Sequence, residues 1–156
     1  MSSVTSSPLR WGPQSWDDII GNWMMKEFFR NLAKQLRDEY RKTGRIPRTA
    51  PCSLLLSGQS RSGKTSLVKF FVRCLMCQSV DAEMNPCRHT CAACRHRPEI
   101  EGREDLFSVT ATSPGELLVD LQIIDCGRTN TPAALEERLR RLEYFPNQLT
   151  VVFLDE

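Results

Sequence analysis

Residues 58–65 match the phosphate-binding loop pattern G-x-x-x-x-G-K-[ST] at every defined position. Glycines let such a loop turn its backbone N–H groups toward phosphate oxygens, and the following helix adds the positive end of its dipole. Lys64 would reach the outer phosphates, and the Thr65 hydroxyl would hold Mg²⁺. An apolar run precedes the loop and a helical pattern follows it, which favours a phosphate site over a glycine-rich turn that matches by accident. The residues expected at the phosphates are Gly58, Gln59, Ser60, Arg61, Ser62, Gly63, Lys64, Thr65 and Ser66.

A second group of residues capable of chemistry ends the sequence. Residues 149–154 form a continuous apolar run, as expected of a strand buried on both faces, and Asp155 and Glu156 follow it. Such a strand would deliver Asp155 to the Mg²⁺ shell, and Glu156 could polarise an attacking water. Two acids after a strand are common, so this signal gains its value from residues 58–65. Together the two predict hydrolysis of ATP rather than binding alone.

Four closely spaced cysteines predict a metal centre. Tetrahedral zinc takes four thiolates at about 2.3 Å, and short steps between cysteines supply them in pairs. The surrounding loop has little apolar content and would hardly offset its ordering entropy without a metal, which disfavours four free thiols. We therefore predict structural Zn²⁺ with no open coordination position. The expected ligands are Cys77, Cys87, Cys91 and Cys94, and His89 or His96 could substitute for one of them.

Composition indicates an ordinary folded protein. The 156 residues are 40% hydrophobic and 26% charged, which suits a single domain with a real core. A net charge of +2 is too small to indicate nucleic-acid or membrane binding by itself. Residues 1–8 lack the apolar core of a signal peptide, and no apolar run approaches the roughly 20 residues that span a bilayer. We therefore expect a soluble, cytoplasmic protein with no membrane partner.

The cysteine count points to the same compartment. Seven cysteines, an odd and clustered number, indicate reduced thiols and metal rather than a disulfide framework. Three of them lie in apolar stretches outside the cluster. We expect these three, Cys52, Cys74 and Cys126, to be small core residues.

The first half of the chain must position the phosphate loop. Residues 9–22 are expected to form an extended arm against an apolar surface, with a simple capping arm as the alternative. Apolar residues at helical spacing predict a helix over residues 23–42, with Asn22 as its cap and Gly44 just past its end. A short strand at residues 54–57 should lead into the loop, and the next helix should end near Cys77. The charged residues assigned to the solvated face of the first helix are Lys34, Arg37, Asp38 and Arg41.

The second half should complete an α/β protein with a largely parallel sheet. Residues 106–110 and 117–126 both have strand patterns, and the turn signal at 113–115 between them makes an added hairpin plausible. A helix is expected to begin after Thr131, with Pro132 at its first position. The strand at residues 149–154 follows it.

With these residues identified, the chain resembles bacterial clamp-loader ATPases of the AAA+ class, the gamma/tau subunits of DNA polymerase III. Residues 10–22 resemble the amino-terminal signature of that family, and residues 58–65 match its phosphate loop. The cysteine cluster falls where the family has its zinc module, just after the first helix of the phosphate loop. Residues 124–129 resemble a family segment that ends in Arg-Thr, and residues 154–156 resemble its Walker B end.

The resemblance implies a fold, a ligand and partners. It divides the chain into an arm at residues 1–22 and the first part of a P-loop ATPase domain at 23–156, with a zinc-binding insertion at 77–94. Arg128 and Thr129 would face the DNA backbone, where contacts fix register without reading sequence. The implied cofactors are ATP, Mg²⁺ and Zn²⁺, and the implied partners are other clamp-loader subunits, the sliding clamp and primed DNA, in a hetero-oligomer. The residues that would frame the adenine are Trp11, Pro13, Ile19 and Ile20.

The same resemblance implies an incomplete sheet. In that family the phosphate-loop strand lies between two strands whose sequence would follow Glu156, and the arginine finger and the helical lid also lie there. The strand at residues 54–57 should therefore lack both neighbours, and unpaired buried backbone groups are costly. We expect the isolated chain to be truncated after Walker B, prone to aggregate and poor at ATP turnover.

Three functions compete on this basis. The first is a motor that hydrolyses ATP to load a sliding clamp on primed DNA, and the second is a non-catalytic scaffold that binds zinc and nucleotide. The intact Lys64, Thr65, Asp155 and Glu156 favour the motor. The third is another AAA+ or signalling ATPase, against which the arm and the cysteine cluster both count.

Overall fold

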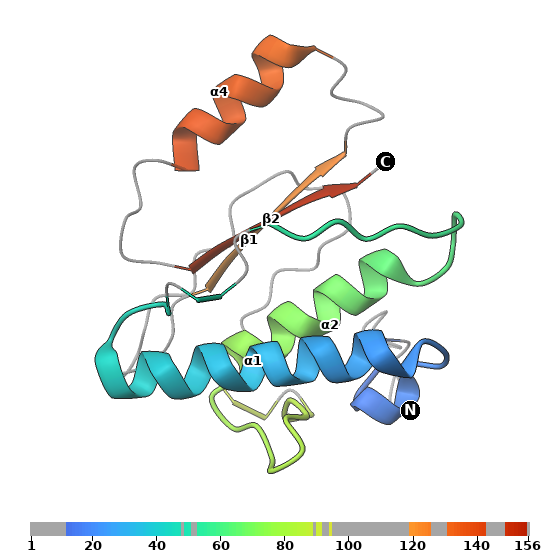
Figure 1. The fold of residues 1–156 in the computed structure, drawn as a ribbon, viewed down its shortest axis with the longest axis vertical. Helices are drawn as coiled ribbons and strands as arrows, with labels where there is room; N and C mark the ends of the chain where they lie inside the picture. The colour runs from blue at the N-terminus through green and yellow to red at the C-terminus, as the bar shows by residue number, and fades with distance from the viewer. Residues whose placement is uncertain are drawn as a thin grey trace, which may run out of the picture.

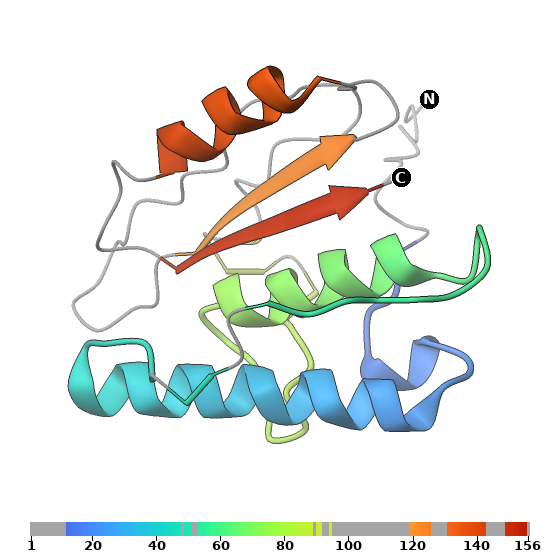
Figure 2. The same cartoon turned by 45° about the horizontal axis from the view of Figure 1, so that its top comes forward.

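The computed structural model describes residues 12–47, 49–50, 53–88, 90–91, 94, 119–125, 131–142 and 149–155. Within them α1 and α2 lie side by side, the two strands lie above these helices, and α4 lies beyond the strands (Figure 1). The turned view keeps this order of layers (Figure 2). The elements are a 3-10 turn η2 (Trp16–Asp18), α1 (Trp23–Thr43), α2 (Lys64–Met76), β1 (Val119–Asp125), α4 (Pro132–Leu142) and β2 (Leu149–Asp155).

The two strands pair in parallel. Val119 lies opposite Leu149 and Asp125 opposite Asp155, and α4 belongs to the crossover that parallel neighbours require. The strand predicted at 117–126 is confirmed over the described residues 119–125, and the strand at 149–154 and the helix with Pro132 at its first position are confirmed as well. Burial of the last strand on both faces is wrong, because its side chains are half-buried and that of Leu154 is 52% exposed. Leu149, Val151 and Phe153 pack against the core, so one face of β2 is covered, whereas Leu154 on the other face is exposed.

The predicted first helix forms nearly as expected. The Asn22 side chain accepts a hydrogen bond from the Met25 N–H at 3.3 Å, and Gly44, in the left-handed conformation at φ +66°, ends the helix. One assignment is wrong, because Arg37 is buried with 7% of its surface exposed. It lies one turn after the fully buried Ala33, so it points with the apolar stripe and not with the charged face.

Aromatic contacts join the arm, α1 and α2 into the core. The rings of Phe29 and Phe71 lie 5.0 Å apart at 64°, which fixes α1 against α2. The Trp16 ring meets Phe70 edge to face at 4.9 Å and is itself 3% exposed. Each such pair adds about 0.5–1.5 kcal/mol beyond the area it buries. The arm is therefore a docked part of the core, as expected of a segment packed on an apolar surface, and Cys74 is a core residue as predicted.

The predicted strand at residues 54–57 does not form. Residues 53–59 carry no regular secondary structure, and Leu55 is 93% exposed while Leu56 packs against the core. A strand exists only where a neighbour completes its hydrogen bonds, and no described segment pairs with this one. Several other predictions lie outside the described residues: the strand at 106–110, the turn at 113–115, and Trp11, Cys52, His89, His96, Cys126, Arg128, Thr129 and Glu156.

Candidate phosphate site and metal centre at the two ends of one helix

The predicted phosphate loop, residues 58–65, leads directly into α2. Gly63 precedes the helix with φ +87° and ψ 9°, a left-handed conformation that favours glycine, and its carbonyl accepts from the Leu67 N–H at 2.9 Å. Within the loop, residues 59–62 form a turn in which the Ser62 N–H donates to the Gln59 carbonyl at 3.2 Å. Arg61 at this turn also has a positive φ of 61°, which is uncommon for a residue with a side chain. Residues 58–63 thus form a tight turn that leads into a helix, as predicted, but the strand predicted before the turn is absent from the described residues.

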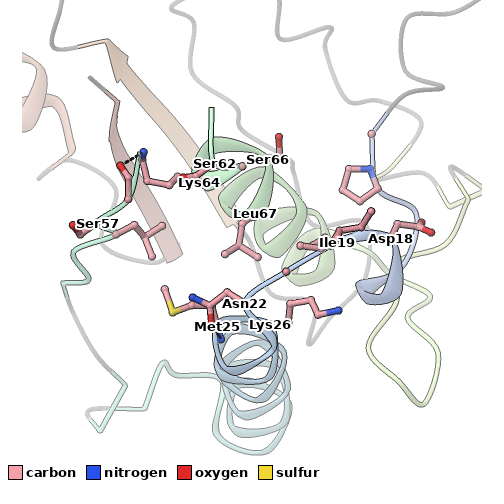
Figure 3. A pocket seen from close by; sticks show the side chains of 17 residues that line it. Asp18, Ile19, Asn22, Met25, Lys26, Ser57, Ser62, Lys64, Ser66 and Leu67 are labelled. Atoms are coloured by element: carbon pink, nitrogen blue, oxygen red, sulfur yellow. Dashed lines mark hydrogen bonds between the residues drawn. The ribbon is translucent and has the colours of Figure 1, made fainter. Parts of the chain in front are cut away.

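Lys64 is folded back on its own loop. Its Nζ donates to the carbonyl oxygens of Gly58 and Gln59, each at 2.8 Å, and Figure 3 shows the side chain reaching back to the loop. These acceptors are neutral, whereas hydrogen bonds between an ammonium and a charged phosphate are roughly twice as strong. A phosphate entering the loop would therefore compete well for this cation.

A cavity of about 610 Å³ opens beside the loop, within the range of small-molecule sites. Pro13, Ile19 and Ile20, predicted to frame an adenine, all line it, although the Ile20 side chain is 97% exposed. On the opposite side lie residues 62–64, so one cavity joins an apolar wall to the phosphate loop. Sequence reasoning missed the third wall, formed by the first turn of α1. Its lining residues are Asn22, Met25 and Lys26 (Figure 3).

Asp18 holds the arm in shape at this cavity. Its carboxylate accepts from the N–H groups of Gln14 at 2.7 Å and Ser15 at 2.9 Å. These backbone donors favour the charged form and lower the pKa of Asp18 below its usual value. The carboxylate is thus satisfied by the arm itself, which fixes the turn between Pro13 and Ile19.

Of the predicted acidic end, only the backbone of Asp155 lies within the described residues. Asp155 is the last residue of β2 and lies opposite Asp125 in the parallel register. In both ribbon views the carboxyl end of β2 and the loop that precedes α2 lie on the same side of the molecule (Figures 1 and 2). The predicted hydrolysis of ATP needs the two segments on one side of the molecule, although this placement alone is shared by many folds.

The four predicted metal ligands come together at the other end of α2. The sulfur atoms of Cys77, Cys87, Cys91 and Cys94 all lie within 4.8 Å of one another. Tetrahedral zinc with bonds of about 2.3 Å needs sulfurs roughly 3.8 Å apart, and the Sγ atoms of Cys77 and Cys91 are already at 4.0 Å. Cys77 is fully buried, which suits a closed structural site. The residues therefore fit a four-thiolate metal centre.

Backbone donors prepare these sulfurs for a cation. The Cys77 sulfur accepts from the N–H groups of Cys87 at 3.2 Å and Ser79 at 3.4 Å. The Cys91 N–H donates to the Cys87 sulfur and the Cys94 N–H to the Cys91 sulfur, each at 3.4 Å. The Cys94 thiol donates to Cys77 as well, and together these bonds lower the pKa of Cys77 to about 5. The same shared proton raises the pKa of Cys94. Thiolates are the ligand form, so Cys77 is prepared to bind a metal at neutral pH.

Two buried arginines that sequence reasoning missed hold this end of α2. Arg37 donates from Nη1 to the carbonyl oxygens of Cys74 at 3.1 Å, Leu75 at 2.9 Å and Cys77 at 2.7 Å. It thereby satisfies carbonyls that the helix end leaves free, although burial lowers the pKa of the guanidinium. Arg73 projects from the last turn of α2 and is 6% exposed. The helical angle of Arg37 could have revealed its burial; no local signal marks Arg73.

Comparisons of the chain with protein-family models, with curated proteins and with solved structures found no match. In the part of the chain that the structure describes, every helix is too short or too polar to cross a bilayer. The site therefore rests on its own geometry.

Proposed function

We propose that the chain binds ATP and hydrolyses it as an AAA+ ATPase of the clamp-loader type, acting with partner subunits to load a sliding clamp on primed DNA. One observation carries the proposal: the cavity of about 610 Å³ has the phosphate loop on one side and an apolar arm on the other. ATP has the same two parts, a polyphosphate and a flat base with large apolar faces. A phosphate ion alone would leave the wall of Pro13 and Ile19 unused.

Each residue then has a role. Lys64 leaves its loop carbonyls to hold the outer phosphates, and the loop N–H groups and the start of α2 hold the rest. Thr65, one residue into α2, and Asp155, at the end of β2, are the residues that would hold Mg²⁺, whose charge would stabilise the phosphates. Glu156 follows Asp155 and would orient the attacking water. Arg128 and Thr129 would contact the DNA backbone.

A non-catalytic scaffold is the second candidate, and one observation favours it. The Lys64 ammonium is satisfied by two loop carbonyls, while the four cysteine sulfurs lie within 4.8 Å of one another and three of them accept hydrogen bonds from backbone N–H groups. A protein that binds nucleotide only to stabilise an assembly would show this balance.

Binding and turnover separate the candidates. We expect the zinc-loaded chain to bind a non-hydrolysable ATP analogue with Mg²⁺, measured by calorimetry, and the Lys64→Met variant to bind it at least about tenfold more weakly, the loss of some 1.4 kcal/mol. The matched control is Lys69→Met, which removes an ammonium from the same helix outside the cavity. Absence of binding by the wild type would refute the nucleotide site.

The second measurement is ATP hydrolysis with and without primed DNA and clamp-loader partners. Stimulation by both supports the motor, because the partners would supply the rest of the catalytic site. Tight binding without any stimulated hydrolysis would instead leave the scaffold as the function.

A further inference from the structure

One buried guanidinium joins the arm at the cavity to the cysteine cluster. Arg73 donates from Nη1 to the Pro13 carbonyl at 3.2 Å, and from Nη2 to the Gln14 Oε1 at 3.1 Å and the Cys87 carbonyl at 2.7 Å. Pro13 lines the cavity and Cys87 is a predicted metal ligand. The Arg73 Nε has no partner among the described groups, so the other contacts must hold this charge in place. The two sites therefore share one cation.

Trp16 makes a second connection between the same two regions. Its backbone N–H donates to the Asn85 Oδ1 at 2.9 Å, and its indole Nε1–H donates to the Met84 carbonyl at 3.0 Å. Both acceptors belong to the loop between Cys77 and Cys87. Trp16 itself lies in the arm, within the turn that Asp18 fixes. The arm is thus hydrogen-bonded to the cysteine loop at two places, through Arg73 and through Trp16.

The position of that loop depends on the cluster. Residues 78–86 form a loop that begins after Cys77, at the end of α2, and leads back to the cluster at Cys87. At the tip of this loop the Asp81 carboxylate accepts from the N–H groups of Glu83 and Asn85. Met84 stands in this turn at φ +63°, an uncommon conformation for a side-chain-bearing residue. A metal that draws the sulfurs of Cys77 and Cys87 together fixes both ends of the loop. Without the metal, the ends of the loop are no longer held together. The carbonyls of Met84 and Cys87 and the Asn85 side-chain amide, which hold Trp16 and Arg73, are then less well positioned.

We infer that metal bound at the cysteine cluster raises the affinity of the cavity for nucleotide, with Arg73 and Trp16 as the positioning residues that carry the coupling. The inference rests on the proposed nucleotide site. A bound metal fixes the loop, the loop holds the arm, and the arm presents Pro13 and Ile19 to the base. Linkage is reciprocal, so nucleotide also raises the affinity for metal by the same factor.

The test uses two ligands on the full chain, each measured by calorimetry with saturating Zn²⁺ and after a chelator has removed it. A non-hydrolysable ATP analogue contacts both the loop and the arm, whereas inorganic tripolyphosphate contacts the loop alone. We expect Zn²⁺ to lower the Kd of the analogue about tenfold, within the usual range of coupling factors, and to leave the Kd of tripolyphosphate unchanged. In the reverse direction, the analogue should lower the Kd for Zn²⁺ by the same factor.

Three variants locate the coupling. Arg73→Lys keeps the charge but loses the fork that spans Pro13, Gln14 and Cys87, so the factor should fall toward unity. Trp16→Phe keeps a ring against Phe70 and loses the indole donor, so the factor should fall partly. The matched control, Arg37→Lys, alters a buried arginine at the same end of α2 whose hydrogen bonds go to the carbonyls of Cys74, Leu75 and Cys77. It should weaken Zn²⁺ binding yet keep the full factor once Zn²⁺ is saturating.

The outcomes divide cleanly. An analogue Kd that ignores Zn²⁺ would overturn the coupling while the nucleotide site stands, and so would a full factor in Arg73→Lys. An equal Zn²⁺ effect on tripolyphosphate would also overturn it, because the metal would then act by folding α2 as a whole. If neither ligand binds the zinc-loaded chain, the proposed function itself fails.

Discussion

The two ends of α2 differ in how they are held. At the carboxyl end, Arg37 donates a buried hydrogen bond to the Cys77 carbonyl, Arg73 donates to the Cys87 carbonyl, and four sulfurs lie within 4.8 Å of one another. At the amino end, Lys64 donates to two carbonyls of its own loop, and Leu55 before the loop is 93% exposed. One helix thus has a fixed end and an open end.

The difference teaches that ligands close together in sequence can be brought together within one short segment. The cysteine loop lies next to α2 in sequence and is closed by short-range bonds, so 18 residues from Cys77 to Cys94 bring all its ligands together. The phosphate loop instead needs a strand at residues 54–57, and a strand needs neighbours that no described segment supplies. Metal should therefore stabilise the fixed end, and the open end should respond mainly to ligand.

Removing the metal should have the largest effect. Cys77→Ser should abolish tight Zn²⁺ binding, and the wild type should lose about 4 kcal/mol of unfolding free energy when a chelator removes free Zn²⁺ that had stood near 1,000 times its Kd. Calorimetric titration measures Zn²⁺ binding, and denaturant unfolding with and without chelator measures the free energy of unfolding. Cys74→Ser is the control, because it alters a buried cysteine on the same helix outside the cluster and should keep Zn²⁺ binding. Equal stability of the metal-free and zinc-loaded chains would show that metal does not stabilise the carboxyl end of α2, and the contrast between its two ends would fail.

Loss of the buried Arg37 guanidinium should have the second largest effect on stability. Arg37→Met keeps much of the apolar stem but leaves three helix carbonyls without their donor, which should cost about 1–3 kcal/mol. Arg41→Met, on an exposed position of α1, should stay within about 0.5 kcal/mol of the wild type in the same chemical unfolding experiment. A more stable Arg37→Met protein would mean that burying the charge costs more than its bonds return.

The same contrast explains what could be predicted from sequence. The helix at residues 23–42, its Asn22 cap and Gly44 end, and the spacing of the cysteines are local patterns, so they were predictable. Trp16 was expected to pack, yet its partners Met84 and Asn85 lie nearly seventy residues away. Arg73 likewise bonds Pro13 across sixty residues, and no spacing rule finds such a pair.

Arg37 was wrongly assigned to the solvated face of its helix because it is charged. A charged residue on an amphipathic helix is usually solvated, but a guanidinium that finds several carbonyl acceptors can be buried. Its angular position beside Ala33 was readable from the sequence. The carbonyls at the end of α2 that accept its bonds were not, because they come from the packing of one helix on the other. The strand predicted at residues 54–57 failed for the related reason that its pattern was local and its hydrogen-bond partners were not.

At the open end, loss of a side chain should change stability little. Lys64→Met removes two bonds from an exposed loop, so the free energy of unfolding should stay within about 0.5 kcal/mol of the wild type even though nucleotide binding is weakened. The measurement is denaturant unfolding beside Arg37→Met. If both variants lose the same stability, the two ends of α2 are held equally well and the contrast between them is wrong.

The smallest effect should come from Asp18, which shapes the arm at the open end. Its folded pKa lies below the usual 3.8, so the charged carboxylate stabilises the arm above that pH, and this contribution is lost as the pH falls through the lowered pKa. Asp18→Asn should remove the dependence and speed amide exchange at Gln14 and Ser15 at neutral pH, without a change in global unfolding. Because acid also displaces zinc by protonating its ligands, the carboxyl titration must be followed by NMR in metal-free protein. A pKa for Asp18 at or above 3.8 would show that the Gln14 and Ser15 donors do not hold it, and the arm would then depend on Arg73 and Trp16 alone.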